Sequence, residues 1–73
     1  MQKSRTDVLH IVGTNLRLAR ISKNLSLTEL SKLTGIDKGD LSKMEAGKIN
    51  FGIITLYHLR DSLEIGIEQF FQE

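Results

Sequence analysis

Apolar residues recur along the chain at intervals of three and four, the spacing that places them on one face of an α-helix. No stretch alternates polar and apolar residues long enough to predict a strand. The pattern divides into successive segments that run from about Asp7 to Lys23, from the Ser26 cap to Gly35, from the Asp37 cap to near Gly47, from about Ile53 to Leu63 and from Ile67 to Gln72. The sequence therefore predicts an all-α fold of five short helices.

The second and third segments carry the strongest signals for helix ends. Ser26 and Glu29 have the S-x-x-E spacing of a capping box, in which each side chain satisfies a backbone N–H near the other residue. Asp37 is the predicted N-cap of the third segment. Only residues 34–36 separate the two helices, and a turn this short that contains Gly forces a large crossing angle. This arrangement is a helix-turn-helix.

The periodicity also predicts the core and the points where helices stop. Gly35, Gly47 and Gly66 follow or interrupt apolar segments, where a left-handed turn is expected. The predicted core positions are Val8, Leu9, Val12, Leu16, Ala19, Leu27, Leu30, Leu33, Leu41, Met44, Ile53, Leu56, Leu59, Leu63, Ile67 and Phe70 or Phe71. Residues 1–6 precede the first periodic segment and are predicted to form a flexible arm.

Composition narrows the class of protein. A chain of 73 residues with 40% apolar residues predicts a single domain over residues 1–73, too small for a second core or an enclosed catalytic pocket. The absence of Cys excludes a disulfide framework, a thiolate metal site and a Cys nucleophile, and favours the cytoplasm. No apolar run reaches the ~18 residues of a membrane span, and MQKSRTD does not resemble a signal peptide.

The net charge of +1 conceals an uneven distribution along the chain. Residues 1–48 contain nine Lys or Arg and five Asp or Glu, a net of +4. Residues 49–73 contain one Arg and four acids, a net of −3. Such a split has two interpretations: a basic face that attracts a polyanion, or ordinary variation of surface charge. Charge alone does not decide between them.

The chain offers little for catalysis or for a cofactor. His10 and His58 are the only imidazoles, and each has an acid three residues away, Asp7 and Asp61 respectively. One helical turn brings such residues together, and a solvated surface pair is the more common outcome. No Gly-rich phosphate loop, H-E-x-x-H or nucleophile motif is present. We expect no enzyme, no metal, no cofactor and no small-molecule ligand.

The stretch LSLTELSKLTGIDKGDLSKMEAGKIN resembles the helix-turn-helix core of the phage-repressor-like, Cro/Xre-type DNA-binding domains, a lambda-repressor-like fold. The resemblance implies a transcriptional regulator that binds double-stranded DNA, in most cases as a homodimer on a palindromic operator, acting as a repressor or small controller protein. It extends from about Gly13 to Phe71 through family-typical elements: Leu16-Arg17, Arg20, Leu25-Ser26, Glu29-Leu30, Gly35-Ile36, Leu41-Ser42, Met44-Glu45, Gly47-Lys48, Asn50, Thr55-Leu56, Leu63 and Phe70-Phe71.

By matched position, the resemblance implies that the third helix enters the major groove. Lys38, Gly39, Asp40, Ser42 and Lys43 would then face the bases. A Lys can donate to guanine O6 and N7, and an Asp can accept from cytosine N4. Asp40 can instead stabilise the first turn of the helix, as an acid near the positive end of the helix dipole. The absence of a side chain at Gly39 either allows the helix to approach the bases closely or reflects neutral sequence drift.

Phosphate contacts are expected on both sides of that helix. The first backbone N–H groups of a helix favour anions, which points to Ser26, Leu27 and Thr28, with Lys48 and Asn50 on the other side. Three departures from the family pattern stand out. They are Leu27 in place of a DNA-contacting Gln, Arg60 in place of a small packed residue and Phe51 in place of a frequent Pro. Leu27, if exposed, would suit a protein contact instead.

Two further assignments follow from the resemblance. Arg20 and Glu45 would form an internal ion pair between the first and third helices. Phe70 and Phe71 would divide between closing the core and forming a dimer seam. RNA polymerase or a toxin is a possible protein partner. The alternative to a DNA-binding regulator is a helical interaction module, such as an antitoxin or anti-regulator, that uses Leu27 and residues 38–43 to bind a protein.

Overall fold

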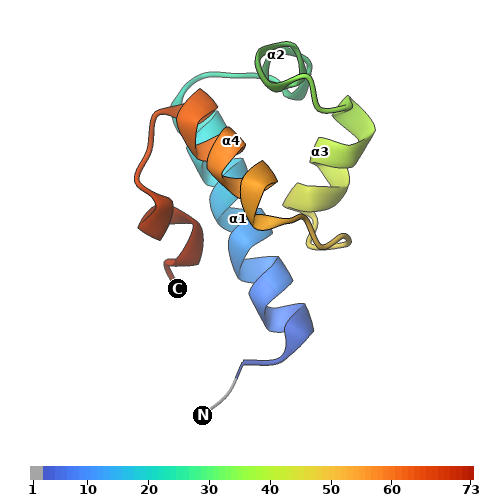
Figure 1. Cartoon of the computed structure of the whole chain (residues 1–73), viewed down its shortest axis with the longest axis vertical. Helices are drawn as coiled ribbons and strands as arrows, with labels where there is room; N and C mark the ends of the chain where they lie inside the picture. The colour runs from blue at the N-terminus through green and yellow to red at the C-terminus, as the bar shows by residue number, and fades with distance from the viewer. Residues whose placement is uncertain (1–2) are drawn as a thin grey trace.

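The structure, a computed structural model, describes residues 3–73 and consists of four α-helices followed by a 3₁₀ helix (Figure 1). Their bounds are α1 Arg5–Ser22, α2 Leu27–Thr34, α3 Lys38–Glu45, α4 Ile53–Leu63 and η1 Ile67–Phe71. The prediction of five α-helices is corrected at the last element. There the Gln69 N–H donates to the Gly66 carbonyl at 3.1 Å, the tighter i to i+3 bond of a 3₁₀ turn.

Helix α1 begins earlier than the periodicity predicted. Ser4 and Asp7 form a capping box, with the Ser4 hydroxyl accepting from Asp7 N–H at 3.1 Å and Asp7 accepting from Ser4 N–H at 3.2 Å. Arg5 and Thr6 are therefore helical, and the predicted flexible arm over residues 1–6 is wrong from residue 4 onward. Residues 1 and 2 lie outside the described part of the chain.

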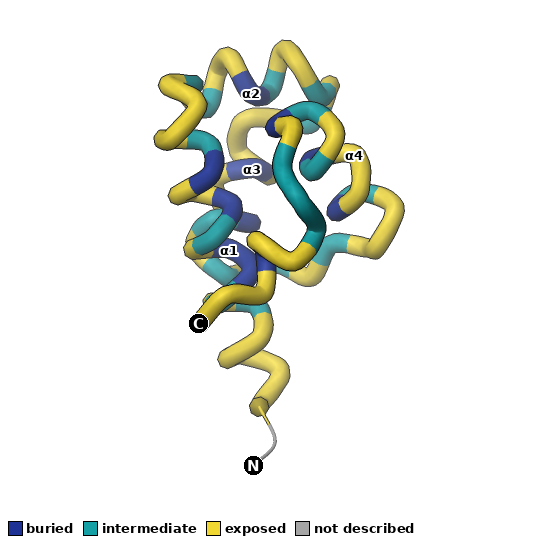
Figure 2. The backbone as a smooth tube through the Cα atoms, turned by 90° about the vertical axis from the view of Figure 1, so that its left-hand side faces the viewer, coloured by how far each residue is buried: buried dark blue, intermediate teal, exposed yellow. Residues whose placement is uncertain are grey.

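The core lies where α1, α3, α4 and η1 meet beneath α2, and Figure 2 shows the buried segments turned toward this centre. Helix α1 contacts α3 and η1, whereas α2 contacts α3 and α4. Leu16, Leu30, Leu41, Leu59, Leu63 and Phe70 are essentially fully buried. Each of the five elements therefore contributes at least one side chain to a single apolar core.

Three of the predicted core positions are exposed. Leu33 is 58% exposed and Ile53 67% exposed, and Val8 is also at the surface. Leu33 lies in the last turn of α2 and Ile53 is the first residue of α4. The helical periodicity correctly predicted the buried residues in the middle of each helix. Residues at helix ends project past the neighbouring helices. Their burial depends on what packs beyond the helix end.

Two helical segments end, as predicted, at a glycine in the left-handed backbone conformation. Gly35 has φ 75° and Gly47 has φ 71°. The prediction for Gly66 is wrong because its φ is −77° and it precedes η1. Helix α4 ends instead on Glu64, which has φ 55°, while the Ile65 N–H donates to the Arg60 carbonyl at 3.2 Å. A non-glycine residue thus takes the strained position.

The C-terminal segment is fastened to α1 by Asn15. Its side-chain amide donates to the carbonyls of Phe70 at 2.9 Å and Gln72 at 2.8 Å. Phe70 is 0% exposed and completes the core, whereas Phe71 is 50% exposed. The two aromatics divide between core and surface. Of the two residues expected to divide between the core and a dimer seam, Phe70 is therefore the one in the core.

Candidate nucleic-acid interface

Helix α3 has one buried side and one open side. Leu41 and Met44 anchor it in the core. The five predicted base-reading residues are all exposed on the remaining surface: Lys38, Gly39, Asp40, Ser42 and Lys43. In Figure 1, α3 runs along the outside of the molecule, at a steep angle to α2. No element in the described part of the chain covers this outer face.

Side chains at the end of α2 hold the turn that sets the position of α3. The Ser31 hydroxyl donates to the Ile36 carbonyl at 2.6 Å, and the Thr34 hydroxyl accepts from the Ile36 N–H at 3.1 Å. His58 Nε2 lies 2.8 Å from the Thr34 carbonyl oxygen and so connects α4 to the same turn. With Gly35 left-handed, the reversal between the helices is defined by side chains from both α2 and α4.

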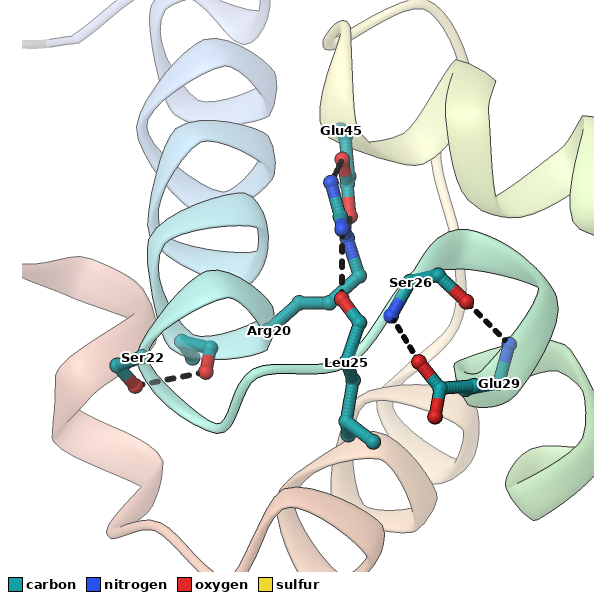
Figure 3. Close-up of polar contacts among 7 residues, drawn as sticks. Arg20, Ser22, Leu25, Ser26, Glu29 and Glu45 are labelled. Atoms are coloured by element: carbon teal, nitrogen blue, oxygen red, sulfur yellow. Dashed lines mark hydrogen bonds and ion pairs between the residues drawn. The ribbon is translucent and has the colours of Figure 1, made fainter.

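Arg20 and Glu45 connect α1 to the last residue of α3 (Figure 3). Arg20 Nε donates to Glu45 Oε2 at 2.7 Å, and Nη2 donates to Oε1 at 3.1 Å. A third bond, from Arg20 Nη1 to the Leu25 carbonyl at 2.8 Å, reaches the segment that leads into α2. Hydrogen bonding to Glu45 raises the pKa of Arg20. The ion pair implied by the resemblance is present. Together with the bond to Leu25 it connects α1 to α3 and to the segment before α2.

The start of α2 is a fully formed cap. The Ser26 hydroxyl accepts from the Glu29 N–H at 3.0 Å, and the Ser26 N–H donates to Glu29 Oε1 at 2.8 Å (Figure 3). Thr28 is exposed beside it. Leu27 is half-buried and packs against the core, so it is not the exposed apolar contact that would suit a protein partner. Ser26 and Thr28 remain accessible to an anion.

Lys48 and Asn50 lie in the loop that follows α3, and both are exposed. The Lys48 N–H donates to the Lys43 carbonyl at 2.9 Å, and the Gly47 N–H donates to that of Met44 at 3.1 Å. Two successive bonds of this kind close the helix end. Lys48 is therefore placed on a defined backbone next to the end of α3. Asn50 lies farther along, at the edge of an apolar groove beside Phe51.

Gly13 and His58 help to position α3, but sequence reasoning missed both roles. A Cβ at Gly13 would collide with the carbonyl oxygens of Met44 and Glu45, so the end of α3 packs directly on the backbone of α1. A small residue between the buried positions Val12 and Leu16 was the available signal. His58 had no such signal, because its partner is a backbone carbonyl in another helix.

The other polar residues that were singled out have structural partners. Asp7 caps α1, while Asp61 pairs with Arg60 at 2.7 Å rather than with His58. Arg60 is half-buried, and its guanidinium carbon lies 5.8 Å from the centre of the Tyr57 ring, while its buried Nε has no hydrogen-bond partner among the described residues. Across residues 3–73, no group of three or more His, Asp or Glu side chains gathers where it could hold a metal ion. None of the helices in this range is both long and apolar enough to cross a membrane.

The arrangement defines a class of protein: a helix-turn-helix domain whose second motif helix exposes a polar face. Residues 16–70 match the HTH_3 helix-turn-helix family. An uncharacterized HTH-type transcriptional regulator of Sinorhizobium fredii, y4dJ, is 34% identical over 59 residues, which span 81% of this chain and 77% of the relative. The chain belongs to the HTH_3 family of DNA-binding transcriptional regulators, which is not a family of enzymes.

Solved structures agree with this assignment. The restriction-modification controller protein C.AhdI from Aeromonas hydrophila superimposes with a TM-score of 0.81 at 30% identity, covering 86% of this chain and 96% of that one. An HTH_3 family transcriptional regulator from Vibrio cholerae gives 0.87 at 29% identity, covering 93% of this chain and 38% of that one. A hypothetical transcription factor from Neisseria, NHTF, shares the fold, with a TM-score of 0.84 at 22% identity over 99% of this chain and 83% of its own.

Proposed function

We propose that this protein is a sequence-specific, double-stranded-DNA-binding regulator that places α3 in the major groove and acts as a homodimeric repressor or small controller protein. The observation that carries the proposal is the contrast between the two sides of α3. Its inner side is fixed by Leu41, Met44 and the Glu45 ion pair, while its outer side carries exposed polar groups. A rigid helix with a free polar face is what groove recognition requires.

Base contacts are assigned to the outer face of α3. Lys38 and Lys43 are the main donors to guanine, and Ser42 can serve as donor or acceptor. Asp40 lies in the first turn of α3, where an acid also favours the helix dipole, and Gly39 leaves room for the groove floor. The side chains of Lys38 and Lys43 form no ion pair within residues 3–73, so neither positive charge is already neutralised.

Phosphate contacts are assigned to the elements on either side of α3. Leu27 and Thr28 provide the first N–H groups of α2, and the exposed N-cap Ser26 lies beside them. Lys48 and Asn50 provide side chains from the loop after α3. These groups fix the orientation of the domain without reading sequence. Their positions on two sides of α3 would allow both strands that border one major groove to be held.

Dimerisation is supported by an apolar surface away from α3. A groove lies between the start of α1, the start of α4 and η1, and its lining includes Phe71, Val8 and Ile53, all of which are exposed. One short recognition helix reads few base pairs. Two helices held about 34 Å apart read both halves of a palindrome. We assign this groove, Phe71 included, to contact with a second copy.

Selection from random duplexes with the purified protein tests the proposed DNA recognition. We expect an enriched inverted repeat whose affinity falls linearly with salt on logarithmic axes, with a slope of about −0.9 for each phosphate contacted. A protein-interaction module would bind DNA weakly and select no sequence. Failure to enrich any motif, together with a flat salt response, would overturn the proposal.

Light scattering on the Phe71→Ser variant tests the dimer. The expected result is a lower average mass than wild type at the same concentration, with unchanged helix content. Leu33→Ser is the matched control, because Leu33 is similarly exposed but lies on α2 outside the groove. A Phe71→Ser protein that keeps the dimer mass would place the seam elsewhere.

A further inference from the structure

A recess opens where α1, α2 and α3 meet, beside the proposed base-reading surface. Its volume is about 390 Å³, and its lining residues are Arg17, Arg20, Leu27, Ser42, Glu45 and Ala46. Each of the three helices supplies at least one of these residues. Ala46 is the C-cap of α3. The recess is therefore built by the same contacts that fix α3, rather than by a mobile loop.

The charges around this recess leave one cation without a partner. Arg20 and Glu45 neutralise each other, and each Arg20 nitrogen already donates a hydrogen bond. Arg17 lies one helical turn before Arg20 and is exposed. Within residues 3–73 it forms neither an ion pair nor a side-chain hydrogen bond. The recess therefore combines a neutral, rigid wall with a single free guanidinium.

The remaining lining residues indicate what kind of group fits. Leu27 and Ala46 offer no side-chain hydrogen bond, so the polar contacts of a ligand fall to the other lining residues. The Ser42 side chain is exposed, and its hydroxyl has no partner among the described residues. Guanidinium and hydroxyl are both donors that suit a tetrahedral oxyanion, and Arg binds phosphate in a two-bond geometry.

We propose that Arg17 is a further DNA-contacting residue, which holds one backbone phosphate against this recess beside Ser42. The proposal rests on the proposed function, because it is the insertion of α3 that brings a DNA strand past Ser42. Arg17 acts through charge and orientation and not by reading bases. It would supply, from α1, a side-chain phosphate contact near the start of α2, where Leu27 provides none.

Salt-dependent binding of Arg17→Gln to the selected duplex tests the assignment. A homodimer loses two phosphate contacts, one from each protomer, so the salt slope should fall by about 1.8, and wild type should lose about 12-fold more affinity than the variant when salt rises fourfold. Base preference and melting temperature should not change, because Arg17 is exposed and unpaired. Lys23→Gln is the control, since it removes the same charge from the C-cap of α1, outside the recess.

Duplexes carrying one neutral methylphosphonate at successive positions locate the contact. One position should weaken wild type but have no further effect on Arg17→Gln. An unchanged salt slope in Arg17→Gln, or equal effects of every methylphosphonate on both proteins, would overturn the assignment. A melting temperature lowered to the level of Arg20→Ala would also overturn it, by showing a structural role. Wild-type protein that fails to bind any duplex in a salt-dependent way would instead refute the proposed function.

Discussion

Gly13 of α1 packs directly against Met44 of α3, and the space between the two backbones leaves no room for a methyl group. A Cβ at this position would meet the Met44 carbonyl oxygen and would lie 2.9 Å from the carbonyl oxygen of Glu45. Both obstacles are backbone atoms, which cannot rotate away as a side chain can. The position of the proposed recognition helix is therefore set in part by the absence of a side chain on another helix.

Gly13→Ala is expected to destabilise the domain. Overpacking typically costs about 1–3 kcal/mol, more than the gain of up to about 1 kcal/mol from replacing Gly by Ala inside a helix. Thermal denaturation followed by circular dichroism should show a lower melting temperature. Gly52→Ala is the comparison variant, because no atom beyond its chain neighbours lies within 4 Å of a Cβ there. It loses only the preference of the α4 N-cap for Gly over Ala, so Gly13→Ala should lower the melting temperature more. An unchanged melting temperature for Gly13→Ala would show that α3 can shift at no cost.

Arg20→Ala should be far more damaging than Arg17→Ala. The Arg20 and Glu45 side chains are 13% and 7% exposed, so removing one strands a charge at a cost of about 3–5 kcal/mol. That is a large part of the 5–15 kcal/mol, roughly, that stabilises a typical domain. Arg17→Ala should change the stability by less than about 0.5 kcal/mol. Denaturant titration measures both.

The double variant Arg20→Met with Glu45→Leu separates the ion pair from simple packing. It removes both charges, and replacing a buried pair by apolar residues is often neutral. Its stability should therefore exceed that of Arg20→Ala. If the double variant is as unstable as the single one, the stranded charge is not the cause of the loss.

Glu64→Gly is expected to stabilise the domain. Glu64 has a φ of 55°, and a non-glycine residue in the left-handed region loses roughly 1–2 kcal/mol. Glycine avoids that cost but loses more backbone entropy on folding, which leaves a net gain of about 0.5–1 kcal/mol. The melting temperature should rise. Glu68→Gly, at a position without positive φ, should lower it, and a fall for both variants would contradict the role given to Glu64.

Stability should fall in acid partly through the capping boxes. The Ser26 backbone N–H, together with its hydroxyl, holds the pKa of Glu29 below its ordinary value of 4.5. The Ser4 hydroxyl and N–H lower the pKa of Asp7 in the same way. A lowered folded-state pKa means that the stabilisation is complete above the unfolded pKa and is lost as the pH falls through the folded one.

Glu29→Gln isolates that contribution, because Gln can still accept from the Ser26 N–H but does not titrate. Between about pH 6 and about pH 3, the melting temperature of wild type should fall more steeply than that of the variant. All other carboxylates are common to the two proteins, so the difference in slope reports Glu29 alone. Parallel curves would show that the cap does not depend on the charge.

Lys43→Ala and Lys48→Ala should affect DNA binding in different ways. Lys43 lies on the outer face of α3, so its loss should relax preference at one base step in each half-site. Lys48 lies in the loop after α3, so its loss should weaken all sequences alike and reduce the salt slope by about 1 for each protomer of the bound dimer. Repeating the duplex selection with each variant measures both effects. Identical changes in the two variants would contradict the assigned roles.

The limits of α2 and α3 could be predicted closely because the signals are local. Ser26 with Glu29, Asp37 and Gly35 act within four residues along the chain, so the sequence contains both partners of each contact. The start of α1 was predictable by the same rule, since Ser4 and Asp7 have the same spacing as the α2 box.

The sequence by itself determined the helices, the short turn and the presence of a polar face on α3, because propensity, capping and period act between near neighbours. Only the tertiary structure decided that Glu64 and not Gly66 reverses the chain after α4, and that Phe70 faces inward while Phe71 does not. It alone also placed Arg17 beside Ser42. The positions of Phe70 and Arg17 depend on residues that are distant in sequence, such as Asn15 and Ser42. They arise from how whole helices pack, which no local pattern encodes.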